Sequence, residues 1–418
     1  MDRLPLVVRT SASGACGRAG CHTQAPAPLS RDFRLLLLAR LVRAFAFGYA
    51  VILVPLQLER RGLSPTQIGL SLAVGILGAG IGSVGWARAS SRIGRRRALA
   101  SIGVLMALTG WDLALSPTAP LLMLAGITGM MGTAAVDLAP FAAIEQAVLA
   151  EAVHAARRNL AFSRYAMTAG LAGAAGGLSA ALAATPQRSD AFFIAYAGIG
   201  LTTAVLGLLL SDQVEGHREA AARRHRLPRA VYTLAGLFAI DAFGGGFVVN
   251  SVIAYWLHLR FHASLGVLGP TFGVLALAQA LSYEMAGRLA NRIGLIRTMV
   301  ITHLPSNVLL LLVPLAPTLP TALVLLVLRF SLSQMDVPTR QAYVVSIVPP
   351  PDRADAAALM TAARGLTAAA GPAISGAALQ SAAFGLPFFL AGGVKILYDL
   401  AVYLGFRQRW AAHERRGE

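Results

Sequence analysis

The sequence has 418 residues, of which 56% are hydrophobic and only 13% charged, and its mean hydropathy is +0.64. This composition excludes an ordinary soluble globule, which needs far more polar surface at this length, and indicates a membrane protein. The net charge of +17 would suit a nucleic-acid partner, but the placement of the arginines along the chain assigns it to membrane topology instead.

Apolar segments recur along the whole chain. A hydrocarbon core about 30 Å thick needs about 20 apolar residues per helix, and twelve segments are of about that length. They are residues 35–57, 66–87, 98–115, 120–143, 160–184, 190–210, 230–257, 265–286, 298–316, 319–343, 361–383 and 387–406. The sequence therefore predicts an all-α membrane protein with 12 transmembrane helices.

Polar stretches divide this pattern into domains. Residues 1–32 are rich in Ser, Gly, Ala and Pro and lack an apolar core of signal-peptide type, so we expect a disordered tail. A basic linker at 212–229 separates six apolar segments in 33–211 from six in 230–410, and residues 411–418 form a second polar tail. The short loops elsewhere make consecutive helices antiparallel neighbours.

Arginine is distributed unevenly between the two sides of the predicted bundle. One side carries Arg88, Arg92, Arg95, Arg96, Arg97, Arg157, Arg158, Arg218, Arg223, Arg224, Arg226, Arg229, Arg288, Arg292, Arg297, Arg353, Arg407, Arg409, Arg415 and Arg416. The other side carries Arg60, Arg61, Arg188 and Arg260. The positive-inside rule then predicts a multi-pass protein of the cell inner (plasma) membrane with both termini in the cytoplasm. The surplus charge is expected to face lipid headgroups, with no nucleic-acid partner.

The chain contains the same signals twice, about 200 residues apart. Residues 91–94 (Ser-Arg-Ile-Gly) return as 291–294 (Asn-Arg-Ile-Gly), and 43–48 (RAFAFG) match 241–246 (DAFGGG). Two further positions match in nearly the same register, namely Arg164 with Arg364 and Gly176 with Gly376. Duplicated halves predict two pseudo-symmetric six-helix bundles with a solute site between them, which is a transporter architecture.

The duplicated loop resembles a motif of the major facilitator superfamily, and the resemblance covers about residues 33–410. In that family a glycine and an acid precede the basic run between the second and third helices. Here Ala87 and Ser91 replace them, whereas the second copy keeps Gly287 but has Asn291 in place of the acid. The resemblance implies the fold of that family, secondary transport by alternating access, and a cytoplasmic gate at this loop.

Both copies of the loop lack the acid, so the gate needs other charges. We expect it to be formed by Arg92, Gly94, Arg95, Arg96, Arg292 and Gly294. Asp137 and Asp336, at matching depths of the fourth and tenth segments, are the expected acid partners, because acids inside membranes pair with nearby cations. The alternative is that one of these two acids carries a coupling proton.

Arg43 and Asp241 bring opposite charges to corresponding positions of the first and seventh segments. In the family these helices face each other across the central cavity. A charge at the bilayer centre costs roughly 2.5 to 3.5 kcal/mol, so each needs water or a partner. One hypothesis is a switch in which Arg43 holds Asp241 ionised and a substrate or proton competes for that bond. The other is a permanent tie between the halves.

Further polar groups lie inside the tenth and twelfth segments. Arg329, Gln334 and Arg340 present hydrogen-bond donors that suit an anionic or carbonyl-bearing solute, although Arg329 equally suits a bridge between helices. Lys395 and Asp399 lie four residues apart and are expected to pair along one helix.

Other classes of protein lack the residues that they need. Lys395 is the only lysine, which excludes a phosphate-binding P-loop in any soluble segment. His258 and His262 have a spacing that suits zinc, but no third ligand is evident. No Ser, His and Asp constellation is evident either. We therefore expect no enzyme, cofactor or metal site.

The sequence predicts a monomeric secondary transporter of a small organic solute, driven by protons, with efflux as the expected direction. The signature of the family's drug-efflux branch is only partly present, because its membrane arginine and its glycine-proline pair appear in the second half, as Arg329 and Gly371-Pro372. One alternative is uptake of an organic anion or sugar, with Arg43 and Arg340 as binding cations. An alternative of another class is a membrane sensor or enzyme without transport.

Overall fold

A computed structural model describes residues 31–116, 118–132, 140–152, 158–215, 227, 229–336, 340, 348 and 353–406. The regular elements in these ranges are helices: α1 (Arg31–Arg60), α2 (Pro65–Ile93), α3 (Arg95–Leu115), α4 (Ala119–Ile127), α5 (Pro140–Ala152), α6 (Arg158–Ser179), η3 (Ala180–Ala183), α7 (Pro186–Leu208), η4 (Asp212–Val214), α8 (Arg229–Gly246), α9 (Asn250–Phe261), α10 (Leu265–Ile293), α11 (Leu295–Leu312), η5 (Val313–Leu315), α12 (Leu319–Ser333), α14 (Arg353–Ala368), α15 (Ala370–Gln380) and α16 (Leu386–Phe406).

The expected all-α membrane fold is confirmed, with several helices divided. Among the described residues, nine helices are long and apolar enough to cross a membrane. The fourth and tenth expected segments begin with the short apolar helices α4 and α12, and the eleventh is divided between α14 and α15. The two expected tails lie outside the described residues, except that Arg31 and Asp32 already belong to α1.

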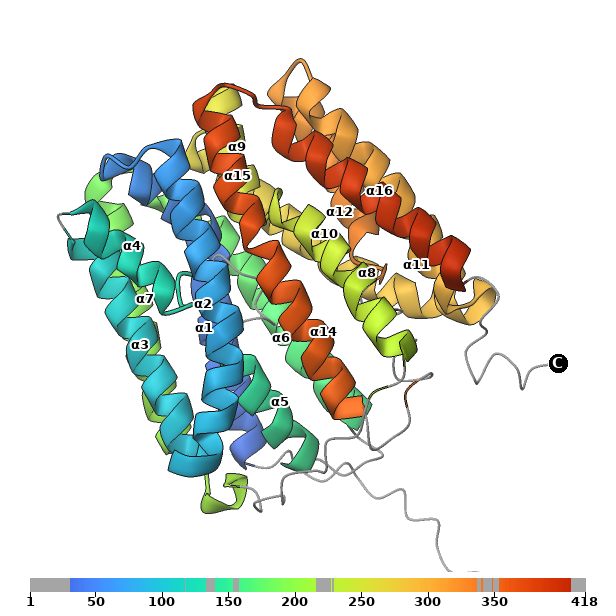
Figure 1. Cartoon of the computed structure of the whole chain (residues 1–418). Coiled ribbons are helices and arrows are strands. Elements are labelled where there is room, and N and C mark those ends of the chain that lie inside the picture. The colour runs from blue at the N-terminus through green and yellow to red at the C-terminus, as the bar shows by residue number, and fades with distance from the viewer. Residues whose placement is uncertain are drawn as a thin grey trace, which may run out of the picture.

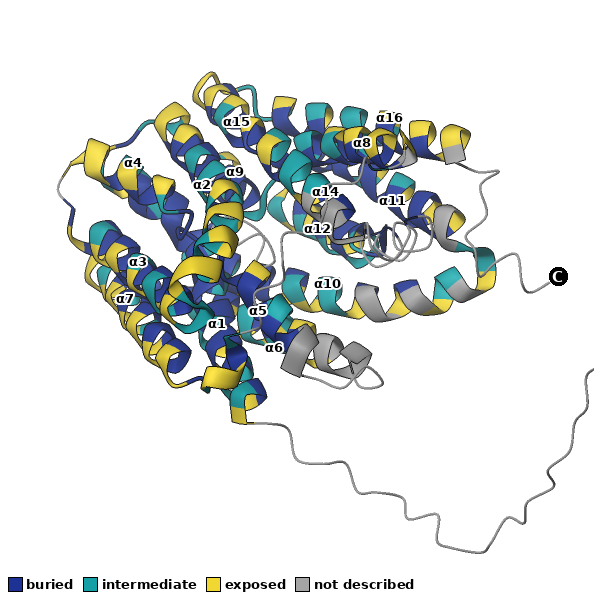
Figure 2. Ribbon diagram, turned by 60° about the horizontal axis from the view of Figure 1, so that its bottom comes forward, coloured by how far each residue is buried: buried dark blue, intermediate teal, exposed yellow. Residues whose placement is uncertain are grey.

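The outward faces of the peripheral helices are apolar and exposed. On α3 the exposed side chains Val104, Leu108, Trp111 and Leu115 recur every three or four residues and so form one stripe. In Figure 2 the exposed parts of α3 and α7 lie on the outside of the molecule, with the buried residues turned inward. An apolar stripe of this kind on an isolated helix face matches the hydrocarbon of a bilayer.

The duplication is visible as the same helix crossing in each half. Figure 1 shows α1 to α7, blue to green, beside α8 to α16, yellow-green to red. A Cβ atom on Gly48 of α1 would lie 2.1 Å from the carbonyl oxygen of Gly173 in α6. A Cβ atom on Gly246 of α8 would lie 2.1 Å from the carbonyl oxygen of Ala368 in α14. Only glycine permits these approaches, so the matching glycines give both halves the same close contact.

The repeated loop also has the same conformation in both copies. Gly94 and Gly294 have φ angles of 92° and 87°, which favour glycine. Each donates its backbone N–H to the helix that it ends, Gly94 to Ser90 O and Gly294 to Ala290 O, at 3.0 Å in both cases. The glycines of the loop motif are thus explained by the sharp turn between two long helices.

The two halves are joined by polar contacts at one end of the bundle. We call the end at which α1 leads into α2 the Gly62 end, and the opposite end the Gly94 end. Thr66 N donates to Gln380 Oε1 at 3.2 Å, and the Tyr255 hydroxyl donates to Glu59 Oε1 at 3.2 Å. His258 Nε2 also lies 3.4 Å from Glu59 Oε2, so three polar contacts link the halves at the Gly62 end.

Candidate functional site

Asp241, near the middle of α8, is the centre of a buried charge network in the second half. The residue is 3% exposed, yet its carboxylate meets cations from three other segments. Lys395 Nζ of α16 lies 2.5 Å from Oδ1, while Arg364 Nη1 of α14 and Arg340 Nη1 lie 3.2 and 3.3 Å from Oδ2. A carboxylate with this many charge-assisted bonds is held firmly in place. Arg340 also bonds to Asp336 at 2.9 Å.

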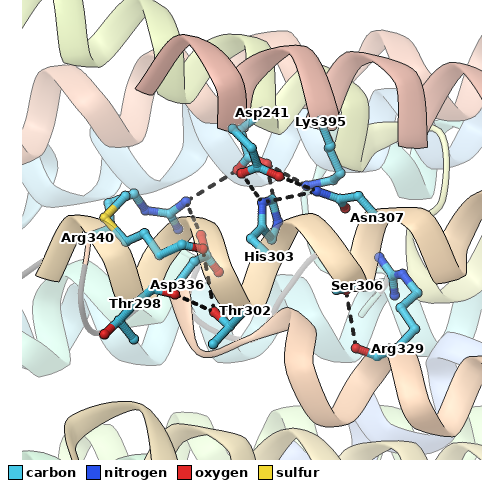
Figure 3. A network of polar contacts seen from close by, with 12 residues as sticks. Asp241, Thr298, Thr302, His303, Ser306, Asn307, Arg329, Asp336, Arg340 and Lys395 are labelled. Atoms are coloured by element: carbon cyan, nitrogen blue, oxygen red, sulfur yellow. Dashed lines mark hydrogen bonds and ion pairs between the residues drawn. The ribbon is translucent and has the colours of Figure 1, made fainter. Parts of the chain in front are cut away.

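A histidine links Asp241 to a second acid. His303 Nδ1, on α11, lies 2.8 Å from Asp399 Oδ1, and its Nε2 lies 3.8 Å from Asp241 Oδ1 (Figure 3). Asn307, one turn further along α11, donates to Asp399 Oδ2 at 2.9 Å. The sequence interpretation missed His303 and Asn307, although two polar residues one turn apart in an apolar segment are a usable signal.

The expected pair between Lys395 and Asp399 is wrong. The two residues lie one turn apart on α16, but the Lys395 ammonium reaches across to Asp241 and the Asp399 carboxylate faces His303 and Asn307. Spacing along one helix could not reveal this outcome, because partners on neighbouring helices at shorter distances compete for the same charges.

The first half has its own smaller cluster around Glu145 of α5. Arg43 Nη2 lies 2.6 Å from Glu145 Oε2, and the Tyr165 hydroxyl of α6 donates to the same oxygen at 2.6 Å. The Arg43 guanidinium also stacks on the Phe141 ring, 4.0 Å from its centroid, and that of Arg40 lies 4.2 Å from the centroid of Tyr165. Aromatic faces attract cations, so this cluster is enclosed by complementary groups.

The structure therefore corrects the expected link between Arg43 and Asp241. Arg43 pairs with Glu145 inside the first half, and Asp241 pairs with cations inside the second half. The sequence interpretation overlooked Glu145, although it is an acid in a helix that is otherwise almost entirely apolar and was a detectable candidate. Arg43 and Asp241 each find their partners within their own half, so they are not in contact in this conformation.

The remaining candidates of the tenth segment lie at the end of α12. Arg329 is 8% exposed, and its guanidinium lies 4.8 Å from the centroid of the Phe330 ring. Gln334 follows the last residue of α12. Asp137, the expected acid of the fourth segment, lies outside the described residues.

The loop at Gly94 finds its acid in the segment after α7. Glu215 accepts from the backbone N–H groups of Arg95 and Arg96 at 2.5 and 3.3 Å, and Asp212 forms an ion pair with the Arg96 side chain. A carboxylate at the start of α3 is favoured by the helix dipole. Glu215 therefore supplies an acid to this loop at the backbone of α3. Arg92 and Arg292 are exposed, and the role of Asp137 and Asp336 as gate partners stays a prediction.

No metal site is found among the described residues, where no three His, Cys, Asp or Glu side chains gather suitably. His258 instead lies with its Nε2 3.4 Å from Glu59 Oε2, in the contact between the halves. Its Nδ1 lies 3.1 Å from the Ala263 carbonyl oxygen.

Comparison with known proteins places this arrangement in context. A sequence model described as the Major Facilitator Superfamily matches residues 36–257 and 234–417. The chain is 24% identical over 417 residues to an uncharacterized membrane protein of Saccharomyces cerevisiae, covering 89% of this chain and 93% of that one.

Two solved structures share the fold. The nucleoside transporter NupG superposes with a TM-score of 0.72 at 14% identity, covering 91% of this chain and 100% of the other. The xylose transporter XylE from E. coli, in an inward open conformation, gives a TM-score of 0.70 at 15% identity, covering 92% and 99%. At such identities the likeness concerns the fold alone.

Proposed function

Because the chain belongs to the major facilitator superfamily, we propose that it is a proton-coupled secondary transporter of a small organic solute that works by alternating access. The two halves rock about a site near the middle of the bilayer. The polar contacts at the Gly62 end support a conformation closed at that end, because three of them link the halves there. The similarity to sugar and nucleoside transporters supports a small organic solute.

The observation that carries the proton coupling is the Asp241 network. Three cations from separate segments depend on one carboxylate, so protonating Asp241 removes the charge that holds Lys395, Arg340 and Arg364 together. Arg364 belongs to α14, which also packs against α2 of the other half. Release of Arg364 therefore offers a route from a proton on Asp241 to movement between the halves.

His303 is the proposed proton donor to Asp241. It lies between two carboxylates, and an imidazole has two ring nitrogens that can each carry a proton. Asp399 and Asn307 orient the ring, while Lys395 and the Tyr398 ring complete its surroundings. The proposed proton path therefore connects Asp399, His303 and Asp241, with His303 in the middle.

The test is transport by purified protein in proteoliposomes under an imposed pH gradient. We expect flux of a transported solute to rise with the gradient, and His303→Gln to flatten the pH profile while leaving the protein folded. Asp112→Asn changes an acid outside the network and is the matched control. Flux that is indifferent to the gradient in the wild-type protein would contradict proton coupling.

The sequence leaves two directions of transport open, efflux and uptake, and one structural observation bears on the choice. Efflux in exchange for protons rests on a partial resemblance to drug exporters. Proton-coupled uptake of an organic anion is favoured by a surplus of cations in the second half, where Arg329, Arg340, Arg364 and Lys395 outnumber Asp241, Asp336 and Asp399. Reversing the gradient across the same vesicles decides the matter, because cotransport follows the protons and exchange opposes them.

The orientation in the inner membrane is proposed from the arginine-rich loops, which lie at the Gly94 end. That end is then cytoplasmic, with both chain termini, and the protein is a monomer. Cys16 and Cys21 are the only cysteines, so they can be replaced by serine and single cysteines introduced. We expect an impermeant thiol reagent outside intact cells to label Arg188→Cys and to leave Ser91→Cys unlabelled; the reverse pattern would contradict this orientation.

A further inference from the structure

The buried face of α12 contains two polar side chains, those of Arg329 and Ser333. The buried residues of α12 are Ala322, Leu326, Arg329, Phe330 and Ser333. All but Phe330 follow a spacing of four, three and four residues that places them on one face. Arg329 is 8% exposed and Ser333 is 7% exposed. A buried stripe in a membrane helix normally carries apolar or small side chains, so these two polar groups need an explanation.

Neither group has the partner that burial demands. Within the described part of the chain, Arg329 Nε and Ser333 Oγ have no hydrogen-bond partner, and no carboxylate lies within ion-pair distance of Arg329. Three other cations inside the described part of this half, Arg340, Arg364 and Lys395, all reach Asp241. An unpaired buried charge is costly and is retained where it meets a functional partner.

Building on the proposed transport function, we propose that Arg329 and Ser333 form the subsite that binds the anionic oxygen group of the solute, a carboxylate or phosphate. The planar guanidinium donates two parallel hydrogen bonds to such a group, and the hydroxyl one turn away donates a third. The sequence nominated Arg43 and Arg340 as binding cations. Both already pair with acids, so this role passes to Arg329.

The position of the subsite connects it to the proton network. The Ser306 hydroxyl of α11 donates to the Arg329 carbonyl at 3.3 Å, which ties the two helices together at this level. In Figure 3 the Arg329 side chain is turned toward α11, the helix that also carries His303 and Asn307. An anion bound at Arg329 adds negative charge in this region and favours the protonated form of nearby acids, so solute and proton bind together.

The test measures thermal unfolding of the full-length protein in detergent, followed by tryptophan fluorescence. The probes are inorganic phosphate and two matched pairs, glucose with glucose 6-phosphate and benzyl alcohol with benzoate. The variants are Arg329→Met, Arg329→Lys and Ser333→Ala. Arg260→Met removes an exposed arginine at the end of α9 and is the control.

We expect the anionic member of at least one pair to raise the Tm of the wild-type protein more than its neutral member. Arg329→Met raises the Tm without ligand, since it removes an unpaired buried charge, and weakens anion binding at least about tenfold. Arg329→Lys keeps part of the affinity, Ser333→Ala loses about fivefold, and Arg260→Met changes neither property.

Three results would overturn the assignment. The first is a lower Tm for Arg329→Met without ligand, which marks a structural arginine. The second is anion binding that Arg329→Met leaves intact, or no anion-dependent shift in the wild-type protein at about 10 mM, above the usual range of KM. The third is a shift by inorganic phosphate as large as that by either organic anion, which assigns the site to a free ion.

These outcomes are separable from those of the proposed function. An intact anion-dependent shift with flux that disregards the pH gradient contradicts proton coupling and supports the subsite. Gradient-driven flux without any anion-dependent shift in Tm supports proton coupling and contradicts the subsite.

Discussion

The two halves carry corresponding polar clusters of opposite charge. In the first half the cation is on the first helix, Arg43, and the acid is on the fourth, Glu145. In the second half the acid is on the first helix, Asp241, and a cation, Arg340, follows the short helix α12 of the fourth segment. The charges on the first helices thus stand at matching positions with opposite signs, whereas Glu145 and Arg340 are 195 residues apart and do not match in the repeat.

The two clusters also differ in the number of charged groups around each acid. Glu145 is shared by Arg43 and the Tyr165 hydroxyl, with an aromatic ring over the guanidinium, whereas Asp241 is shared by three cations and faces a histidine. A fully satisfied buried pair makes its surroundings rigid. The second cluster differs because an imidazole, which can exchange protons, lies beside its acid. We therefore expect the first cluster to stabilise its half, and the proposed coupling to protons and solute assigns the second cluster a part in transport.

The largest effect is expected from Asp241→Asn. Neutralising this residue leaves three cations, of which Arg340 and Lys395 are buried, without their shared partner, and breaking buried pairs of this kind costs about 3 to 5 kcal/mol. Transport in proteoliposomes should be lost together with its pH dependence. Asp112→Asn should keep both transport and its pH dependence. If Asp241→Asn transported at the wild-type rate with unchanged pH dependence, the proposed difference between the two clusters would be wrong.

Glu145→Gln is expected to lower the stability of the protein without a direct effect on the transport mechanism. The change leaves the Arg43 charge buried and uncompensated, so unfolding should become easier by about 3 to 5 kcal/mol. Adding Arg43→Gln removes that charge, and the double variant should recover most of the stability and retain transport. If the double variant is stable yet inactive, the first cluster takes part in the mechanism as well.

A smaller effect is expected at the loop between α2 and α3. Glu215→Gln weakens a charge-assisted cap on two backbone N–H groups, which we expect to cost about 1 to 2 kcal/mol. Hydrogen exchange at the start of α3 should rise, with little change at α11, which begins after the second copy of the loop. Equal exchange at both helices would show that Glu215 does not replace the missing acid.

The smallest effect is expected from Glu59→Gln at the contact between the halves. Its contacts with Tyr255 and His258 are partly exposed, and pairs of this kind contribute about 0.2 to 1 kcal/mol. The variant should keep its transport rate within a few fold and increase labelling of a cysteine introduced near Gly62. Unchanged labelling would indicate that the apolar packing of α2 on α15 alone closes this end.

Several features were predictable from the sequence because they depend on local chemistry. Apolar length predicted the spans, the repeats predicted two related halves, and the loop glycines were marked by their recurrence before their positive φ angles were visible. Asp241, Arg340 and Arg329 were recognisable as intramembrane charges, since the bilayer makes any such residue conspicuous.

The partners of these charges were decided by the tertiary structure. Lys395 could have paired with Asp399 one turn away, and Arg43 with Asp241 across the halves, yet each found a closer partner on a neighbouring helix. Glu145, His303 and Glu215 became part of the site only when helices far apart in the sequence were packed together. Sequence alone determined that this chain is a duplicated membrane bundle with costly internal charges, because burial in lipid depends on composition. Only packing decided which charges are neutralised and that Arg329 has no acid partner among the described residues, because pairing depends on distances of a few ångströms between helices.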